Sequence, residues 1–354
     1  GETVVRDGTL VAGRRTRLSV DLERTDASDV QPLDLEVFVE AAGPSGEVVS
    51  GPHPVWLESG EDVARFDVWV DGEAIVAEGA VSVRVREPQG AASPDGPRAR
   101  WSARIPEDLD VREVAALDLV IVPIRHAYYD GCAPWDPDRV DFDAWSERLI
   151  QVLPVADVRW QVDAPLVWPH PVESFNDQKA VAATVAAMAE AAPEPGRVIV
   201  GVARRCATCD GTCAGGLAGV GSLPLGIAAV YLEVRETDAV PDVADHEIGH
   251  TAGLLHAPCP AGVGGADPDY PVPDGRIDVP GLGIFDEIER DPAETYDMMG
   301  GCWPRWISRY NWLRLVDVFS VGTPSDEAPP LAPARTGGRV AVVAWDHVPA
   351  RAGP

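Results

Sequence analysis

An eleven-residue segment, His246 to His256, constrains this chain more than any other part of its sequence. It reads HEIGHTAGLLH and holds three of the seven histidines among 354 residues. Because His246 and His250 are four residues apart, a helix places both imidazoles on one face, one turn apart. Gly253 can adopt a positive φ and end that helix, after which the chain can bring His256 back toward the other two. The segment therefore predicts a helix from about residue 242, closed by a tight turn.

Three convergent imidazoles predict a metal site. Neutral histidine nitrogens bind Zn²⁺ at about 2.0–2.1 Å, and catalytic zinc sites use three protein ligands with a fourth position open. Glu247 directly follows the first histidine, where it can accept a proton from water rather than bind the metal. We therefore predict one catalytic zinc ion held by His246, His250 and His256, with Glu247 as general base. A chance alignment of three surface histidines is the alternative.

These residues match the zinc signature HExxHxxGxxH of the metzincin metallopeptidases, and a second motif of that clan follows. Residues 297–302 read DMMGGC and resemble the Met-turn that lies beneath the zinc. The resemblance implies that Met299, or alternatively Met298, packs under the ligands without binding the metal. Within the clan, HAPC at 256–259 and WPRWIS at 303–308 resemble a group of secreted bacterial mucin-cleaving metallopeptidases.

The resemblance implies a secreted zinc endopeptidase that hydrolyses peptide bonds of extracellular proteins or glycoproteins. Glu247 would take a proton from water and return it to the leaving amine. A secreted adhesin or binding protein with a vestigial zinc domain is the alternative, and a zinc amidase acting on non-protein substrates is a third hypothesis. The intact Glu247 favours an enzyme, because nothing in folding requires this residue.

The same resemblance implies where a substrate binds. In metzincins an edge strand before the zinc helix pairs with the extended substrate. Ile227–Val234 is the strand before the zinc helix here, with Ala229 and Tyr231 as candidate contacts. Candidates for a specificity wall after the Met-turn are Trp303, Arg305 and Trp306. The alternative is that these aromatic residues anchor a helix over Ile307–Phe319.

Further ligands are left open by the sequence. The residue two after Met299 is Gly301, where astacins and serralysins have a tyrosine ligand, so whether Tyr296 or Tyr310 assists is undecided. An acidic segment between the third histidine and the Met-turn predicts either a Ca²⁺ site or solvated turns; its carboxylates are Asp267, Asp269, Asp274 and Asp278.

Six cysteines, an even number in an acidic and turn-rich chain, favour disulfides and a location outside the cytoplasm. Cys259 lies three residues after His256 and Cys302 three after Met299, so a Cys259–Cys302 disulfide would fasten the third-ligand loop to the Met-turn. The remaining cysteines, for which disulfides, a CxxC redox pair or a second zinc site are the alternatives, are Cys132, Cys206, Cys209 and Cys213.

The charge of the chain narrows the choice of partners. With 29 Lys and Arg residues against 57 Asp and Glu residues, its formal net charge is −28. Such a field repels the phosphate backbone of nucleic acids and anionic membrane surfaces. No apolar run approaches the roughly 20 residues needed to cross a bilayer. Nucleic acid and a membrane span are therefore not expected, whereas a protein or glycoprotein substrate is what the resemblance implies and a secreted or cell-surface location is what the resemblance and the cysteines imply.

Hydrophobic patterning predicts a mixed α/β domain at 113–322, preceded by an all-β immunoglobulin-like sandwich at 1–112, and the resemblance implies that the α/β domain is a catalytic domain of the α+β metzincin type. Residues 323–354 read as a linker and the start of a further β module. In the first domain the alternating strands are Arg17–Leu22, Asp34–Glu40, Val63–Val70 and Gly79–Val85. In the second, buried strands are expected over Ala116–Pro123, Arg197–Val202 and Ile227–Val234, and helices over Asp141–Val152 and Asp177–Ala191. The resemblance above is strong over about residues 240–312, moderate over 113–240 and only architectural over 1–112.

Overall fold

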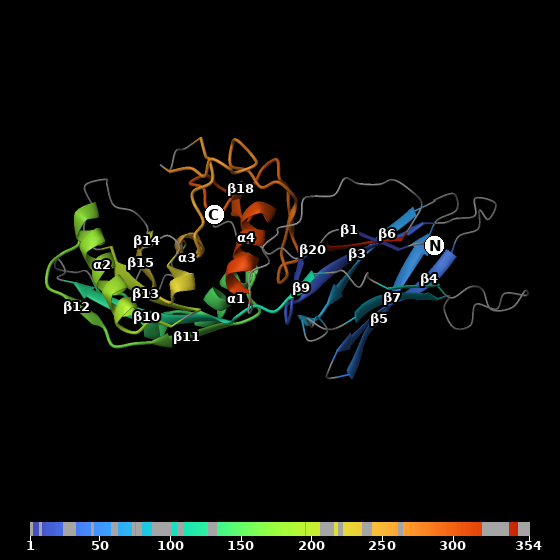
Figure 1. The fold of residues 1–354 in the computed structure, drawn as a ribbon, viewed down its shortest axis with the longest axis horizontal. Helices are drawn as coiled ribbons and strands as arrows, with labels where there is room; N and C mark the ends of the chain where they lie inside the picture. Colours follow the sequence, from blue (N-terminus) through green and yellow to red (C-terminus); the bar gives the residue numbers. More distant parts are fainter. Residues whose placement is uncertain are drawn as a thin grey trace, which may run out of the picture. The chain divides into compact units, whose positions relative to one another are not determined.

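The chain divides into two compact units in the computed structural model (Figure 1). Unit 1 comprises Gly1–Val114 and Val321–Asp346, and unit 2 comprises Ala115–Ser320 and His347–Pro354. The structure describes residues 3–6, 9–23, 33–43, 46–57, 63–72, 75, 80–86, 101–104, 110–126, 133–194, 196–205, 216–218, 222–235, 243–260, 265–320 and 340–345. The domain boundaries expected from the sequence stay a prediction.

Unit 1 consists mainly of β-strands in its described part: β1 Thr3–Arg6, β2 Thr9–Val11, β3 Thr16–Glu23, β4 Leu33–Gly43, β5 Gly46–Leu57, β6 Val63–Val70, β7 Ala80–Arg86, β8 Trp101–Arg104, β9 Asp110–Arg112 and β20 Val340–Trp345. One sheet has the order β1-β20-β3-β6, a second has the order β5-β4-β7-β8, and β2 pairs with β9. The β1–β20 and β2–β9 pairs are parallel, and the others are antiparallel.

The four strands expected from alternating residues in this unit are confirmed as β3, β4, β6 and β7. Strand β20 falls within residues 323–354, for which the sequence predicts a linker and the start of a further β module, and it lies between β1 and β3 in a sheet of unit 1. The immunoglobulin-like arrangement stays a prediction.

Unit 2 contains a six-stranded sheet and four α-helices in its described part. The sheet strands are β10 Leu117–His126, β11 Val158–Val162, β12 Leu166–Trp168, β13 Arg197–Arg204, β14 Gly216–Ala218 and β15 Ala228–Val234. Their order is β11-β10-β13-β15-β14, with β12 also paired to β10. Only the β14–β15 pair is antiparallel. The helices are α1 Phe142–Val152, α2 Phe175–Ala191, α3 Ala244–Thr251 and α4 Arg309–Phe319.

The first two helices begin where side chains cap them. The carboxylate of Asp141 accepts the N–H of Ala144 at 3.0 Å at the start of α1, and the four apolar positions expected to be buried are buried: Phe142, Trp145, Leu149 and Val152. Helix α2 begins two residues before its expected start, because Ser174 and Asp177 form a capping box.

Parallel strands with apolar residues on both faces make the core of unit 2. Strand β10 buries Leu119, Ile121 and Val122 to 2% exposure or less, which confirms the prediction of a strand covered on both sides. Helix α2 covers one face of the sheet, where Val181 and Val185 pack in one cluster with residues of β10, β13 and β15. This sheet is the platform on which the following helix, α3, is placed.

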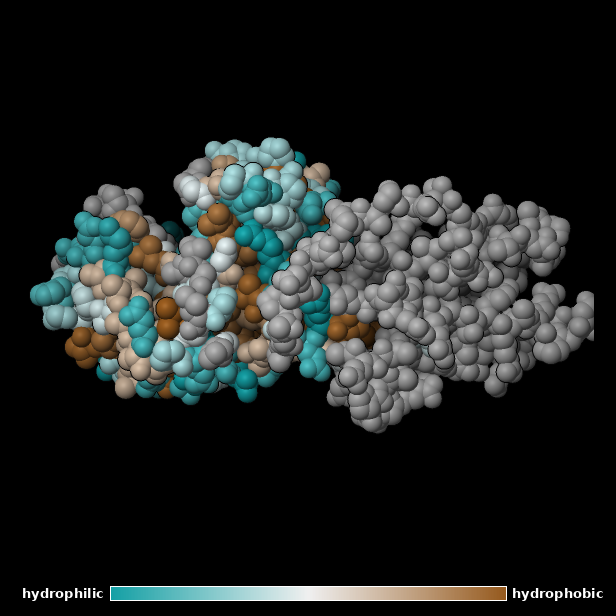
Figure 2. Space-filling view, in the orientation of Figure 1, coloured by the Kyte–Doolittle hydropathy of each residue, from teal (hydrophilic) through white to brown (hydrophobic). Residues whose placement is uncertain are grey.

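The last part of unit 2 is mostly irregular and ends in α4. It contains two short strand pairs, β16 Gly281–Leu282 with β17 Glu289–Arg290 and β18 Tyr296–Asp297 with β19 Arg305–Trp306. Helix α3 lies between the part that carries α2 and the part that carries β18 (Figure 1), and Figure 2 shows the surface of unit 2 indented between these two parts. Within the described ranges, no helix is both long and apolar enough to cross a membrane.

Candidate metal centre

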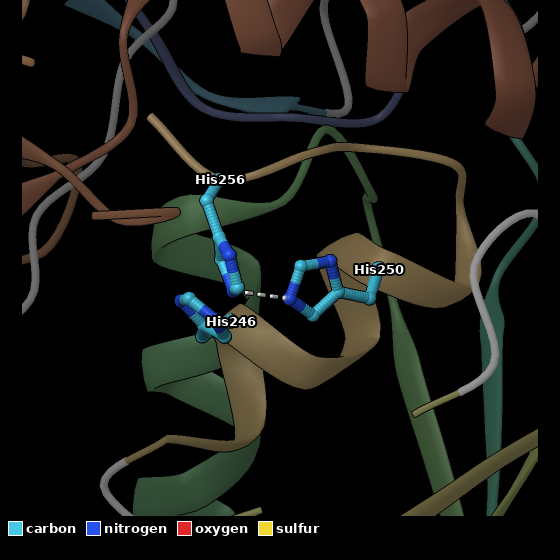
Figure 3. A group of neighbouring side chains, drawn as sticks. All are labelled: His246, His250 and His256. Carbon is cyan, nitrogen blue, oxygen red and sulfur yellow. Dashed lines mark hydrogen bonds between the residues drawn. The ribbon is translucent and has the colours of Figure 1, made fainter. Parts of the chain in front are cut away.

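Helix α3 carries the first two histidines on successive turns. All eight of its residues are buried, so the helix is held by packing on both sides. Its C-terminal cap is Ala252, and Gly253 follows with φ 95°, a left-handed conformation that favours glycine. The expected helix, its end and the turn after it are therefore confirmed. The reversal at Gly253 brings His256 back over the helix (Figure 3).

The three imidazoles converge. One ligand atom from each of His246, His250 and His256 lies within 4.8 Å of the others, and the Nε2 atoms of His250 and His256 are 3.0 Å apart. Two nitrogens on a tetrahedral zinc ion are about 3.3 Å apart if each bond is about 2.05 Å, so the observed spacing suits such an ion. Among the described residues, this is the group of histidine, cysteine and carboxylate side chains that could hold a metal ion.

Backbone carbonyls orient two of these rings. The Nδ1 of His246 lies 2.9 Å from the carbonyl oxygen of Met298, and the Nδ1 of His250 lies 2.8 Å from that of Leu254. Since a carbonyl oxygen can only accept, each Nδ1 carries the proton and each Nε2 keeps its lone pair. Burial lowers the pKa of His246 to about 4 and also lowers the pKa of His250. Both rings are therefore neutral near pH 7, as metal ligands must be.

Glu247 lies on the same helix, against the sheet edge. Its side chain is 6% exposed, and burial raises its pKa to about 8, with the Arg305 charge opposing the rise and Asp245 adding to it. A Cβ placed on Gly216 of β14 would lie 2.6 Å from Glu247 Cγ and 2.9 Å from Oε1. Gly216 thus lets the strand backbone reach the carboxylate. A cation held by the histidines would favour the ionised carboxylate, the form that accepts a proton.

The turn at Asp297–Gly300 lies against α3. A Cβ on Gly249 would meet Met299 Sδ at 2.6 Å and Met298 Cε at 3.3 Å, so both methionines pack against the helix between its two histidines. Met299 is fully buried, and its carbonyl accepts the N–H of Ala257 at 3.1 Å. Both side chains therefore pack against α3, Met298 also contributes the carbonyl that lies against His246, and the assignment of Met299 as the Met-turn residue stays a prediction.

A buried carboxylate fixes this turn. Asp297 is fully buried, and it accepts the N–H groups of Met299 at 2.7 Å and Ser308 at 2.9 Å and the side-chain amide of Asn311 at 2.9 Å. Burial raises the pKa of Asp297, while these hydrogen bonds act against the rise. Sequence reasoning misses Asp297, because no local pattern indicates that a carboxylate accepts from residues 11 and 14 positions later.

The Cys259–Cys302 disulfide is present and joins the chain after His256 to the chain after Met299, as expected. The other four cysteines lie outside the described residues.

The expected specificity wall is only partly exposed. Trp306 is fully buried, so its interpretation as a substrate contact is wrong; the ring lies against Gly281. Arg305 is 8% exposed. Its guanidinium carbon lies 4.1 Å from the centre of the Trp303 ring, and its Nη1 approaches the Met298 carbonyl at 3.5 Å. Trp303, at 50% exposure, faces solvent. The alternative, that these aromatic residues anchor α4, stays a prediction.

The strand expected to meet the substrate is not at the edge of the sheet. Strand β15 pairs with β13 on one side and β14 on the other, and its residues Ala229 and Tyr231 are 7% and 1% exposed. Neither can contact a substrate by its side chain, because both pack in the cluster under α2. Among the described strands the edge is β14, a three-residue antiparallel strand that also touches Glu247. A strand this short that begins with glycine leaves no alternating pattern to recognise.

The remaining candidate ligands have protein partners. The hydroxyl of Tyr310 donates to Asp267 at 3.1 Å, and the Tyr296 ring lies under the guanidinium of Arg276. Burial alone would raise the pKa of Asp267, but hydrogen bonds from Asp269, Arg314 and Tyr310 hold it below the usual value. Asp274 pairs with Arg276 at 3.3 Å, and Ca²⁺ binding in this segment stays a prediction.

No family model and no curated protein matches the chain. Among solved structures, it is similar to the crystal structure of metalloproteinase-II from Bacteroides fragilis, with a TM-score of 0.33 and 15% sequence identity. The match covers 58% of this chain and 53% of that chain, so the chain spans about half the length of the structure it matches. A likeness this distant assigns no activity, and the function rests on the geometry of the site.

Proposed function

We propose that this protein is a zinc-dependent endopeptidase that hydrolyses peptide bonds of extracellular proteins, including glycoproteins. The observation that supports it is the convergence of His246, His250 and His256 beside the buried carboxylate of Glu247. The histidines supply three neutral nitrogen ligands, the number found in catalytic zinc sites, and leave a fourth direction for water or substrate.

In the proposed mechanism, His246, His250 and His256 would hold a zinc ion, which would supply a Lewis acid to polarise the scissile carbonyl and make water more acidic. Glu247 accepts a proton from the attacking water and delivers it to the leaving amine. The carbonyls of Met298 and Leu254 keep the ligand nitrogens aimed inward. The nearby charge of Arg305 favours the ionised form of Glu247 against the effect of its burial.

We place the substrate along β14 rather than along β15. Strand β14 is the last strand of the sheet in the part of the chain that the structure describes, and Gly216 lies beside Glu247. An extended peptide that pairs with its main chain would be held next to the general base, with little dependence on side-chain sequence. Trp303, exposed beside Arg305, is the remaining candidate from the expected wall for contacts to substrate side chains or sugars.

We further propose that the protein is secreted or displayed at the cell surface. Its disulfide supports an oxidising compartment, and its net charge of −28 disfavours nucleic acid as a partner.

The test combines metal analysis with cleavage. Purified protein should contain one zinc ion per chain and cleave casein or members of a peptide library, and a chelator should abolish cleavage until zinc is restored. Glu247→Gln should keep the zinc but lose about 100-fold or more in kcat, whereas the exposed control Glu294→Gln should be unchanged. Stoichiometric zinc without cleavage of any peptide would favour the binding-protein or amidase alternatives, and absence of zinc would refute the proposal.

A further inference from the structure

The third histidine differs from the other two in what supports it. His246 and His250 lie on α3, whose backbone is fixed by helical hydrogen bonds, whereas His256 lies on the chain that follows the helix. The carbonyl oxygen of His256 accepts the N–H of Asp267 at 2.7 Å, and His256 and Ala266 form an isolated parallel bridge. The backbone at His256 is therefore held by a segment ten residues further along the chain.

Asp267 is itself anchored to α4. Its side chain is 5% exposed, and its Oδ2 accepts Arg314 Nη1 at 2.7 Å and the Tyr310 hydroxyl at 3.1 Å. Arg314 and Tyr310 are one helical turn apart, and Arg314 Nη1 also lies 3.2 Å from the Tyr310 oxygen. The other carboxylate oxygen accepts the N–H of Asp269 at 3.0 Å. Both oxygens are thus used, and the stronger contacts, to a guanidinium and a phenol, come from α4.

We propose that Asp267 is a positioning residue for the metal site: it links the backbone of His256 to α4 and so fixes the direction from which the third imidazole approaches the metal. This inference depends on the zinc site proposed above. A carboxylate in this role replaces a helix as the support of the third ligand. It explains why an aspartate that the sequence offered as a calcium ligand is buried and bound to an arginine.

Removing the anchor should change the metal site more than the fold. Residues that orient metal ligands from outside the coordination shell typically change metal affinity by about 10- to 100-fold. In Asp267→Ala both contacts to α4 are lost, and in Asp267→Asn one acceptor oxygen survives. We therefore expect zinc affinity to fall in the order wild type, Asp267→Asn, Asp267→Ala, with the last about 10- to 100-fold weaker than wild type. Arg314→Gln changes the half-exposed partner of the ion pair and should also lower the zinc affinity.

The experiment measures three quantities on the full chain. Competition with a chelating dye gives the zinc dissociation constant, the visible spectrum of the Co²⁺-substituted protein reports the ligand geometry, and urea unfolding of the metal-free protein reports the fold. Asp269→Asn is the matched control, because its side chain is exposed in the same loop and only its backbone N–H contacts Asp267. The double variant Asp267→Ala/Arg314→Gln should be no worse than Asp267→Ala, because both changes break one link.

Unchanged zinc affinity and an unchanged Co²⁺ spectrum in Asp267→Ala and Arg314→Gln would overturn the inference while leaving the proposed function intact. Loss of zinc affinity with an unaltered Co²⁺ spectrum and an equal loss of stability in the metal-free protein would also overturn it, because it would show a structural role only. A wild-type protein that binds no zinc would refute both proposals together.

Discussion

A methyl group added at Gly216 has no room, because it would sit against the side chain of Glu247. Such a Cβ would lie 2.6 Å from Glu247 Cγ and 2.9 Å from Cδ and Oε1. Ordinary van der Waals contact begins at 3.4 Å, so the carboxylate or the strand must move by about 0.8 Å. Both are confined, since Gly216 and Glu247 are buried. The substitution Gly216→Ala is therefore expected to displace the carboxylate from the position in which, by the proposed mechanism, it accepts a proton.

The size of the effect follows from that displacement. A misplacement of about 1 Å at a reacting group lowers the rate by about 100-fold, which corresponds to about 2.7 kcal/mol in the activation free energy. Zinc binding should stay near its wild-type value, because the three atoms nearest to the added one all belong to Glu247. Most of the loss is expected in kcat, since the shifted group acts on the proton rather than on substrate binding.

The assay is peptide cleavage under saturating zinc, with zinc content measured on the same samples. Ala218→Ser, which adds one atom two residues along the same strand, is the control and should keep most of the wild-type rate. Full activity of Gly216→Ala with zinc bound would refute the reasoning, since it would mean that the carboxylate tolerates the shift or is not the base. Loss of zinc together with activity would show that the damage extends to the histidines.

Three further outcomes are expected. Trp306→Ala should lower the free energy of unfolding by about 3–5 kcal/mol in urea titrations, because the ring is fully buried. Trp303 is 50% exposed, so Trp303→Ala should change this free energy by less than about 1 kcal/mol. Equal effects of the two substitutions would contradict the burial of Trp306. Replacing Cys259 and Cys302 by serine opens a link between residues 43 apart and should destabilise the protein by about 4 kcal/mol, measured against a wild-type sample under the same non-reducing conditions. Burial raises the pKa of Glu247 from 4.5 to about 8. Its contribution to the free energy of unfolding of the metal-free protein is therefore fully present below pH 4.5 and is lost as the pH rises toward 8. Below about pH 6.5 the lowered pKa of His246 acts in the opposite sense. The free energy of unfolding of the metal-free protein should therefore fall between about pH 6.5 and 8, and Glu247→Gln should remove this fall. A fall of the same size in that variant would exclude Glu247 as its cause.

The local sequence pattern is enough to predict those elements that are stabilised by residues close to one another in the sequence. The apolar spacing in Asp141–Val152 predicts the buried face of α1, and the four-residue spacing of His246 and His250 with Gly253 predicts the helix and its turn.

Contacts between distant segments cannot be predicted in this way. Strand β5 contains Gly51, Pro52 and Pro54, a composition that disfavours a strand, so its sequence does not predict one. The strand forms because its pairing with β4 overrides this local preference. The position of β15 before the zinc helix favours it, by resemblance, as the substrate-binding strand, whereas Gly216–Ala218, the last strand of the described sheet, is recognised only from its pairing with β15. Trp306 and Trp303 look alike in the sequence, and only the packing against Gly281 separates a core side chain from an exposed one.

The two carbonyl oxygens that face His246 and His250 have a consequence for how the metal is acquired. Since the turn at Met298 and the helix end at Leu254 already aim both rings, little conformational entropy is lost when an ion arrives. Chelation should therefore empty the site without unfolding unit 2, in contrast to zinc fingers, whose fold depends on the ion. Such a protein can fold first and take up its metal afterwards.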